Sequence, residues 1–297
     1  MKKRRIKYFI IICIILLAIP NFYIFKYLFC AEKYQMKKNQ FTDDFVVMSY
    51  NIRCWTFLDI GKKSWFYRAD LIIDNISAVE PDIIGFQEVT SGQYLYLKDN
   101  LQGYSSVISY RDTTPWSEGC PIFFNTNRYE LIETQTFWLS DTPDKISKGW
   151  DAADYRICSC VVLWDRQAEK KLAVFNTHLD HKSEEARVKG MEVIAERIIQ
   201  LGDIPTILLG DFNSTEDMDA YSYITNILSD TKYETEISVL GNTYHNWGKQ
   251  LEGGPIDYIM VSKNNFSIVE YAIFSKSYKG VFPSDHFPIY VKMKFQD

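Results

Sequence analysis

The sequence WFYRADLIIDNISAVEPDIIGFQE, residues 65–88, contains the pattern that decides the fold class. Its first part predicts an amphipathic helix over 65–79, which ends before the proline because the residue preceding a proline disfavours helical backbone. Residues 82–86 (DIIGF) predict a short buried strand. Upstream, residues 45–50 (FVVMSY) are rich in β-branched and aromatic side chains and predict another buried strand. The order strand, helix, strand indicates an α/β protein.

The rest of the chain is rich in strands. A second amphipathic helix is predicted over 183–201, where apolar residues recur at helical spacing. Further strands are predicted at 122–124, 156–164, 171–177, 205–209, 257–261 and 289–295. Many strands with few helices between them favour two sheets packed face to face and flanked by helices. Because no repeat or linker divides residues 45–297, we expect one domain there.

Composition excludes several protein classes. The chain has 297 residues, 46% hydrophobic and 24% charged, which excludes a disordered or low-complexity protein. Its net charge is −5, but the first 30 residues contain six basic residues and no acid, so the remainder carries 27 basic against 38 acidic residues, a net of −11. Such an acidic body disfavours charge-driven binding to a polyphosphate backbone. It remains compatible with a phosphate substrate held by a metal ion.

The N-terminus resembles a membrane anchor. A basic cluster over 1–7 precedes 18 uncharged residues, YFIIICIILLAIPNFYIF at 8–25, which is near the lower limit for spanning a bilayer. We expect residues 1–30 to form an uncleaved signal-anchor with one transmembrane helix, followed by a short tether over 31–44. The charge distribution predicts a cytoplasmic N-terminus and an extracytoplasmic domain. A cleaved signal peptide, which would yield a secreted protein, is the alternative.

Polar residues stand where the predicted strands begin or end. They occur at Ser49-Tyr50-Asn51, Gln87-Glu88, Asn176-Thr177-His178, Gly210-Asp211-Phe212-Asn213, Asp257 and Ser284-Asp285-His286. Any one of them has an ordinary explanation as a turn or capping residue. Together, however, they are carboxylates, amides and imidazoles with almost no lysine, and turn chemistry does not explain that selection.

Metal-assisted phosphoester hydrolysis requires this set of groups. Hard oxygen ligands such as Glu88 and Asp285 hold Mg²⁺, which polarises a phosphoryl oxygen. A histidine beside a carboxylate activates water, and the carboxylate is expected to raise the pKa of the imidazole. Neutral amides such as Asn51 and Asn213, and a histidine such as His178, can hold the remaining phosphoryl oxygens through hydrogen bonds. The sequence therefore favours hydrolysis of a phosphoester.

Six motifs carry a resemblance to a known family. The chain resembles the endonuclease/exonuclease/phosphatase (DNase I-like) superfamily in SYNIR (49–53), DIIGFQE (82–88), NTHLDH (176–181), LLGDFN (208–213), IDYIMVS (256–262) and SDHFP (284–288). The resemblance covers residues 45–297 in order and spacing. It implies an α/β fold, a four-layer αββα sandwich, with Mg²⁺ or Mn²⁺ as cofactor. The segments between the motifs resemble a bacterial, membrane-anchored branch.

The resemblance also implies roles for individual residues. The metal ligands would be Glu88, with Asn51 and Asp285 nearby. The catalytic residues would be His286 as the general base, Asp257 to orient it, Asp211 and Asn213 to align the nucleophile and the phosphate, and His178 to stabilise the transition state.

Residues between the motifs are expected to select the substrate. Glu118 and Arg156 are the polar side chains expected to reach the cleft, although a salt bridge from Arg156 to Asp151 or Asp154 is an equal alternative. Trp150, like Trp116 and Trp247, could stack on a base, a sugar or a lipid headgroup.

We therefore predict a monomeric, membrane-anchored, Mg²⁺-dependent phosphoesterase. Its substrate would be a nucleic acid, a nucleotide, a phospholipid headgroup or a sugar phosphate. The alternatives are a phospholipid or sphingomyelin-type phosphodiesterase in place of a nuclease, and a non-enzymatic binding module with a decayed site. The binding module is disfavoured because every expected ligand and base is present.

Overall fold

The structure is a computed structural model that describes residues 33–35, 42–250 and 252–296. The predicted anchor and most of the predicted tether lie outside these residues. Across the described part of the chain, no helix has both the length and the apolar character needed to cross a bilayer.

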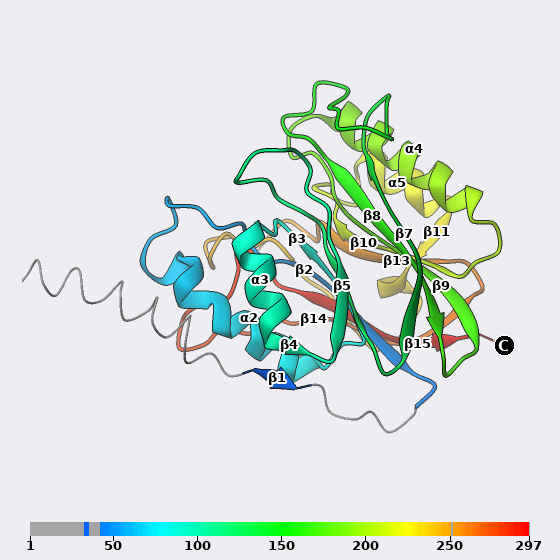
Figure 1. Cartoon of the computed structure of the whole chain (residues 1–297), viewed down its shortest axis with the longest axis horizontal. Coiled ribbons are helices and arrows are strands. Elements are labelled where there is room, and N and C mark those ends of the chain that lie inside the picture. Colours follow the sequence, from blue (N-terminus) through cyan, green and yellow to red (C-terminus); the bar gives the residue numbers. More distant parts are fainter. Residues whose placement is uncertain (1–32, 36–41, 251, 297) are drawn as a thin grey trace, which may run out of the picture.

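Two large sheets form the centre of the domain (Figure 1). In the described residues, one sheet has six strands in the order β11 (Leu228–Asp230), β13 (Asp257–Ser262), β10 (Thr206–Asp211), β9 (Lys170–His178), β8 (Ile157–Asp165) and β7 (Tyr129–Trp138). The other has seven, in the order β12 (Ser238–Val239), β14 (Phe266–Ile273), β15 (Ile289–Phe295), β2 (Phe45–Asn51), β3 (Ile83–Gln87), β6 (Ile122–Asn125) and β5 (Tyr104–Val107). The short strands β1 (Tyr34–Gln35) and β4 (Leu101–Gln102) pair with each other.

Helices cover the outer face of each sheet. Figure 1 shows α2 (Trp65–Val79) and α3 (Ser91–Asn100) on one side of the molecule and α4 (Glu184–Gln200) and α5 (Asp219–Thr225) on the opposite side, with the strands between them. Two 3₁₀ turns, Gly61–Lys63 and Thr231–Tyr233, complete the described elements. The predicted four-layer αββα sandwich is therefore confirmed.

The alternation of side chains along the strands builds the layers. In β2, Phe45 and Val47 point into the apolar core between the sheets, whereas Met48 and Tyr50 point toward α2 and α3. Successive residues of a strand face opposite sides, so one run of apolar residues supplies two cores. The buried thiols of Cys158 and Cys160 pack in the core beneath α4.

A buried amide network joins the two sheets directly below the functional edge. Asn176 of β9 donates hydrogen bonds to the carbonyls of Phe86 (2.8 Å) and Pro121 (2.9 Å), and Gln87 donates to Asn176 Oδ1 (2.8 Å). Gly85 allows this approach, because a Cβ atom there would lie 2.0 Å from Leu209 Cδ1. These contacts fix the separation of the sheets where the polar strand ends converge.

The strand register brings the polar motifs to one edge. In the parallel pair β2 and β3, Asn51 lies opposite Gln87, and in the parallel pair β9 and β10, His178 lies opposite Asp211. Strand β13 runs antiparallel to β10 and begins with Asp257, opposite Asp211. Because β15 runs antiparallel to β2, the residues just before it reach the same edge.

Candidate active site

A cleft of about 320 Å³ opens at this edge. Its lining combines carboxylates, imidazoles and arginines: Arg53, Cys54, Glu88, Arg111, Glu118, Asp154, Arg156, His178, His181, Asp211, Asn213, Tyr244, Ile256, Asp285 and His286. The buried side chains of Asn51 and Asp257 lie directly behind this lining, in contact with Asp211 and His286 respectively. The structure thus brings together ten of the eleven residues that the sequence singled out.

Asn51 connects the two halves of the site. Its amide nitrogen donates to Glu88 Oε1 (3.1 Å) and to Asp211 Oδ2 (3.0 Å), so it joins a carboxylate of one sheet to a carboxylate of the other. Its side chain is buried, which restricts it to this arrangement. The position of Asn51 at the end of β2 therefore determines how the two carboxylates face each other.

Glu88 is held as an ionised carboxylate. It has a positive φ of 61°, a conformation that turns the chain away from the end of β3. The backbone N–H of Cys54 donates to its Oε2 (2.9 Å), and Arg53 Nη1 lies 3.8 Å from the same atom. Burial by itself would raise the pKa of Glu88, but Arg53 and the Cys54 hydrogen bond hold it well below its usual range.

Glu88 and Asp285 provide a donor set that fits a divalent cation. Burial and the neighbouring charge of Glu88 raise the pKa of Asp285, and a bound cation would favour its ionised form. Arg53 lies between them, with Nε 4.0 Å from Asp285 Oδ2. Carboxylate oxygens are the ligands that Mg²⁺ and Mn²⁺ prefer. A second group, Asp211, Asp257 and His286, also clusters closely enough to hold an ion.

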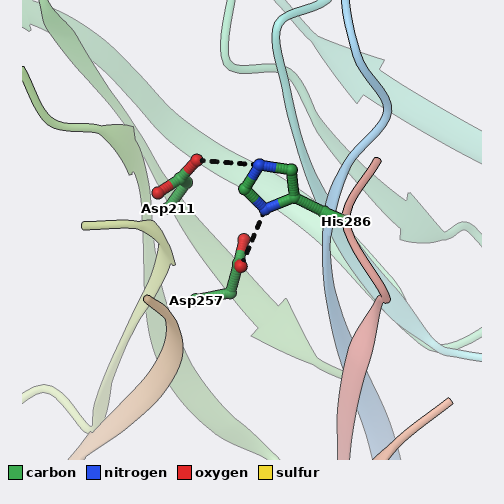
Figure 2. A group of neighbouring side chains, drawn as sticks. All are labelled: Asp211, Asp257 and His286. Atoms are coloured by element: carbon green, nitrogen blue, oxygen red, sulfur yellow. Dashed lines mark hydrogen bonds and ion pairs between the residues drawn. The ribbon is translucent and has the colours of Figure 1, made fainter. Parts of the chain in front are cut away.

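His286 lies between two carboxylates, as Figure 2 shows. Its Nδ1 contacts Asp257 Oδ2 at 2.9 Å, and its Nε2 lies 3.7 Å from Asp211 Oδ2. Burial alone would lower the pKa of His286, but Asp257 and Asp211 raise it to about 10, in the direction the sequence predicted. A cation bound at the adjacent Asp285 would oppose this shift and favour the neutral imidazole that accepts a proton.

Asp211 is the centre of the cluster. Burial and the neighbouring Asp257 raise its pKa to about 7. Its Oδ2 lies 3.5 Å from His178 Nε2, and its Oδ1 accepts a hydrogen bond from the backbone of Asn213 (2.9 Å). Burial and the nearby Arg156 lower the pKa of His178 well below its usual value, so this imidazole is neutral. A neutral ring here is a hydrogen-bond donor that carries no full charge.

Arg156 and Glu118 both line the cleft, which the sequence analysis expected them to reach. Arg156 lies 3.8 Å from Asp154 and 3.6 Å from Asp180, and its Nη2 contacts His181 Nδ1 at 3.1 Å. The salt bridge considered as an alternative is therefore present, to Asp154, in a residue that also lines the cleft. Glu118 pairs with Arg111 at 3.0 Å.

Trp150 does not reach this cleft. Residues 150 and 151 both have a φ of 55°, and this turn directs the indole N–H toward Asp141 Oδ1 (3.1 Å). The backbone of Trp150 is also held in place, because its carbonyl accepts a hydrogen bond from the hydroxyl of Ser183 (2.8 Å). The structure therefore gives no support to its predicted contact with a substrate.

Several cleft residues were not singled out from the sequence. They include Arg53, Arg111, His181 and Tyr244, and Asp154 was considered only as a salt-bridge partner of Arg156. Arg53 belongs to the SYNIR motif, so its place beside Glu88 had a signal, whereas Arg111 and Asp154 lie in loops without a pattern. Behind the cleft, the buried Arg68 donates to the carbonyls of Ile52, Arg53 and Pro283 and thereby joins the loop that carries Arg53 to the segment that carries Asp285.

Known proteins are similar to this chain in sequence and in fold. The model of the Endonuclease/Exonuclease/phosphatase family matches residues 48–286. An uncharacterized protein of Acanthamoeba polyphaga mimivirus is 32% identical over 252 residues, which are 76% of this chain and 91% of that protein. The structure of an endonuclease/exonuclease/phosphatase from Bacteroides vulgatus superposes with a TM-score of 0.80 at 30% identity, over 85% of this chain and 99% of that one.

A structure with a defined activity is also similar. The mannosyl-6-phosphatase of Bacteroides thetaiotaomicron superposes with a TM-score of 0.79 at 30% identity and covers 84% of this chain and 100% of its own. Other matched curated relatives include exoribonuclease subunits, and the chain spans half or less of their length. With this match over most of its length, the chain belongs to the endonuclease/exonuclease/phosphatase family and is a hydrolase of phosphoester bonds.

Proposed function

We propose that this protein is a Mg²⁺-dependent phosphomonoesterase that acts on a small phosphorylated metabolite of the sugar phosphate type. One observation carries the proposal: oxygen donors suited to Mg²⁺ and a buried Asp–His pair face the same cleft of about 320 Å³. That volume suits a small substrate. Similarity to a mannosyl-6-phosphatase over most of both chains supports the choice.

The charge of the cleft supports a small substrate over a polynucleotide. Glu118 and Asp154 line the cleft next to Arg111 and Arg156, so the two arginines are already paired with carboxylates. A protein that binds a nucleic-acid backbone needs unpaired lysines and arginines along its groove. This cleft instead contains one compact group of paired charges, Arg111 and Arg156 with Glu118 and Asp154.

In the proposed mechanism, Glu88, Asp285 and Asn51 would hold the cation. When bound, Mg²⁺ supplies a Lewis acid that polarises a phosphoryl oxygen and neutralises charge on the leaving oxygen. The ionised Glu88 would be the principal ligand, because its lowered pKa keeps the carboxylate charged throughout the physiological range. Arg53 would keep its contact with Asp59 (3.2 Å) and could turn its other N–H groups from the two carboxylates to the phosphate.

The chain's own residues would then move one proton and position one water. His286 accepts the proton of the attacking water at Nε2, while Asp257 holds Nδ1–H and stabilises the imidazolium. Asp211, 3.7 Å from His286 Nε2, orients that water, and Asn213 binds a phosphoryl oxygen. Neutral His178 donates a hydrogen bond to the charge that develops on the phosphoryl group.

The test is a substrate panel with the purified full chain in detergent and Mg²⁺. We expect release of inorganic phosphate from hexose phosphates, with much slower cleavage of RNA, cyclic nucleotides and sphingomyelin. A Glu88→Gln protein, purified identically, shows whether a contaminating phosphatase is responsible. Cleavage of diesters without release of phosphate from monoesters would overturn the proposal in favour of a nuclease or phospholipid phosphodiesterase.

We also propose that residues 1–30 anchor the enzyme in a membrane with the catalytic domain outside. The proposal rests on the basic cluster and the uncharged run that follows it. We expect the chain to fractionate with membranes and to retain its first residues, as measured by intact mass. Loss of a segment of about 30 residues would indicate a secreted enzyme instead.

A further inference from the structure

A second hollow of about 470 Å³ lies beside the catalytic cleft. The two share the lining residues Cys54, Arg111, Glu118 and Asp154, so they form one continuous depression. None of the catalytic steps proposed above uses the part that lies beyond these shared residues. This outer part is where the portion of a substrate remote from its phosphate would extend.

Aromatic side chains form the wall of the outer hollow. Trp55 and Phe57, from the loop after β2, contact each other with ring centroids 4.7 Å apart. Trp116 stands in the loop between β5 and β6, and its exposed fraction is 64%; that of Phe57 is 74%. Large aromatic side chains left this exposed next to an active site are typical of a ligand-binding surface.

The loops that present these rings are well ordered by hydrogen bonds. The N–H of Trp55 donates to Gln93 Oε1 (2.9 Å), which ties its loop to α3. Around Trp116, the N–H of Asp112 donates to Ser117 Oγ (3.0 Å), and the N–H of Ser117 donates to the carbonyl of Thr114 (3.1 Å). The wall is therefore preformed, so little ordering is needed when a ligand binds.

The floor of the hollow is polar and predominantly acidic. Arg111 Nη1 lies 3.0 Å from Glu118 Oε2, and its Nη2 lies 3.6 Å from Asp154 Oδ1. The third carboxylate, Asp112, lies 3.7 Å from Arg111 Nε, and that buried N–H has no hydrogen-bond acceptor in the described part of the chain. The floor thus offers several carboxylate acceptors and one unsatisfied donor.

We infer that the outer hollow binds the sugar ring of the substrate and thereby determines specificity. Trp116 and the Trp55–Phe57 pair would cover the apolar faces of the ring, and the carboxylates of Asp112, Glu118 and Asp154 would accept its hydroxyl groups. Asp112, Glu118 and Asp154 outnumber the neighbouring guanidinium groups of Arg111 and Arg156, and this excess of negative charge disfavours a polynucleotide or a nucleoside polyphosphate. This inference rests on the proposed phosphomonoesterase activity.

The experiment compares substrates with and without a ring. Mannose 6-phosphate and glycerol 3-phosphate are assayed with the full chain and with the Trp116→Ala, Trp116→Phe and Ile199→Ala variants. Ile199 on α4 is a matched control, because its exposed fraction is 65% and it lies outside both hollows. For Trp116→Ala we expect kcat/KM to fall roughly tenfold for the sugar phosphate and less than about twofold for glycerol 3-phosphate.

The other variants sharpen the result. Trp116→Phe should recover most of the loss, since an aromatic face remains, and Ile199→Ala should behave as the parent enzyme. An equal loss for both substrates, no loss for either, or a preference for adenosine monophosphate that depends on Trp116 would each overturn the inference.

A binding measurement separates this inference from the proposed activity. Free mannose, without phosphate, is titrated in EDTA while the intrinsic tryptophan fluorescence is recorded. We expect a saturable change whose amplitude is smaller in Trp116→Phe, because Trp55 in the same hollow still reports binding, whether or not the protein hydrolyses monoesters. Hydrolysis of sugar phosphates without such a change would leave the proposed function intact and overturn the sugar site alone.

Discussion

The contact between His286 and Asp257 offers the most direct test of the mechanism. The two side chains are almost inaccessible to solvent, and His286 Nδ1 lies 2.9 Å from Asp257 Oδ2. Removing a general base costs on the order of 10²–10⁴ in rate, which is the expected fall in kcat for His286→Ala. A hydrogen bond to a charged group contributes about 1.5–3 kcal/mol, so Asp257→Asn should lower kcat about 10- to 100-fold.

The double variant distinguishes shared from separate roles. If Asp257 acts through the imidazole, kcat of the double variant should match that of His286→Ala, since nothing remains for Asp257 to orient. If the two residues act independently, the losses multiply to on the order of 10³–10⁶. The assay is kcat at saturating substrate and Mg²⁺, with KM measured in parallel. Thermal denaturation of each variant provides the control for folding.

The same variants test the alternative cation site formed by Asp211, Asp257 and His286. Titration calorimetry with Mn²⁺ should give nearly unchanged affinity for His286→Ala if Glu88 and Asp285 hold the ion. A collapse of Mn²⁺ binding in His286→Ala, or multiplicative losses in the double variant, would refute the assignment of His286 as a base oriented by Asp257.

Three further predictions concern the metal, the cleft loop and the strand geometry. Glu88→Gln should lower Mn²⁺ affinity by at least about tenfold in calorimetry while the melting temperature is retained, because it removes the charge that holds a hard cation; unchanged affinity would contradict this. Burial alone would raise the pKa of Asp180, but hydrogen bonds from the N–H groups of Ser183, Lys182, Ala153 and Asp154 lower it to about 2. The stabilisation that ionised Asp180 provides is therefore complete above the usual Asp pKa of about 3.9 and is lost as the pH falls from there toward 2. In Asp180→Asn, the unfolding free energy should consequently depend less on pH across this range. Curves of unfolding free energy against pH that run parallel for the parent and the variant would refute the reasoning. Gly210→Ala should lower the free energy of unfolding by several kcal/mol, on the order of the largest single-residue effects. The reason is that residue 210 has a φ of 150° and that an added Cβ would lie 2.0 Å from the carbonyl oxygen of Thr177. A free energy of unfolding within about 0.5 kcal/mol of the parent's in chemical denaturation would contradict this prediction.

Local periodicity was sufficient to predict most of the layered fold. The helix predicted at 65–79 coincides with α2, and that at 183–201 exceeds α4 by one residue at each end. These elements bury a continuous apolar face, and the strands of the central core are unbroken apolar runs, so hydrophobic spacing alone indicates them. The same holds for the catalytic motifs, which are short and immediately follow or precede those strands.

Periodicity did not indicate elements whose buried faces are partly polar. Helix α3 buries Gln93, Tyr96, Leu97 and Asn100, which are spaced as a helix requires, but two of the four are amides. Its start is set by a capping box between Thr90 and Gln93. Strand β14 is not predicted either, although its four fully buried residues are all apolar, because the four residues between Phe266 and Tyr271 are only partly buried and show no regular alternation. In α3, packing and hydrogen bonds replace the apolar pattern.

The tertiary structure alone decided which loop residues share the candidate site. The sequence by itself determined the fold class, the carboxylates and imidazoles at the strand ends and their order along the chain. It did not indicate that Arg111 and Asp154 meet at the cleft, or that Trp150 turns away to Asp141. The reason is physical: a catalytic motif is fixed to the end of a strand, whereas a loop side chain takes its direction from backbone turns and from partners that are distant in sequence.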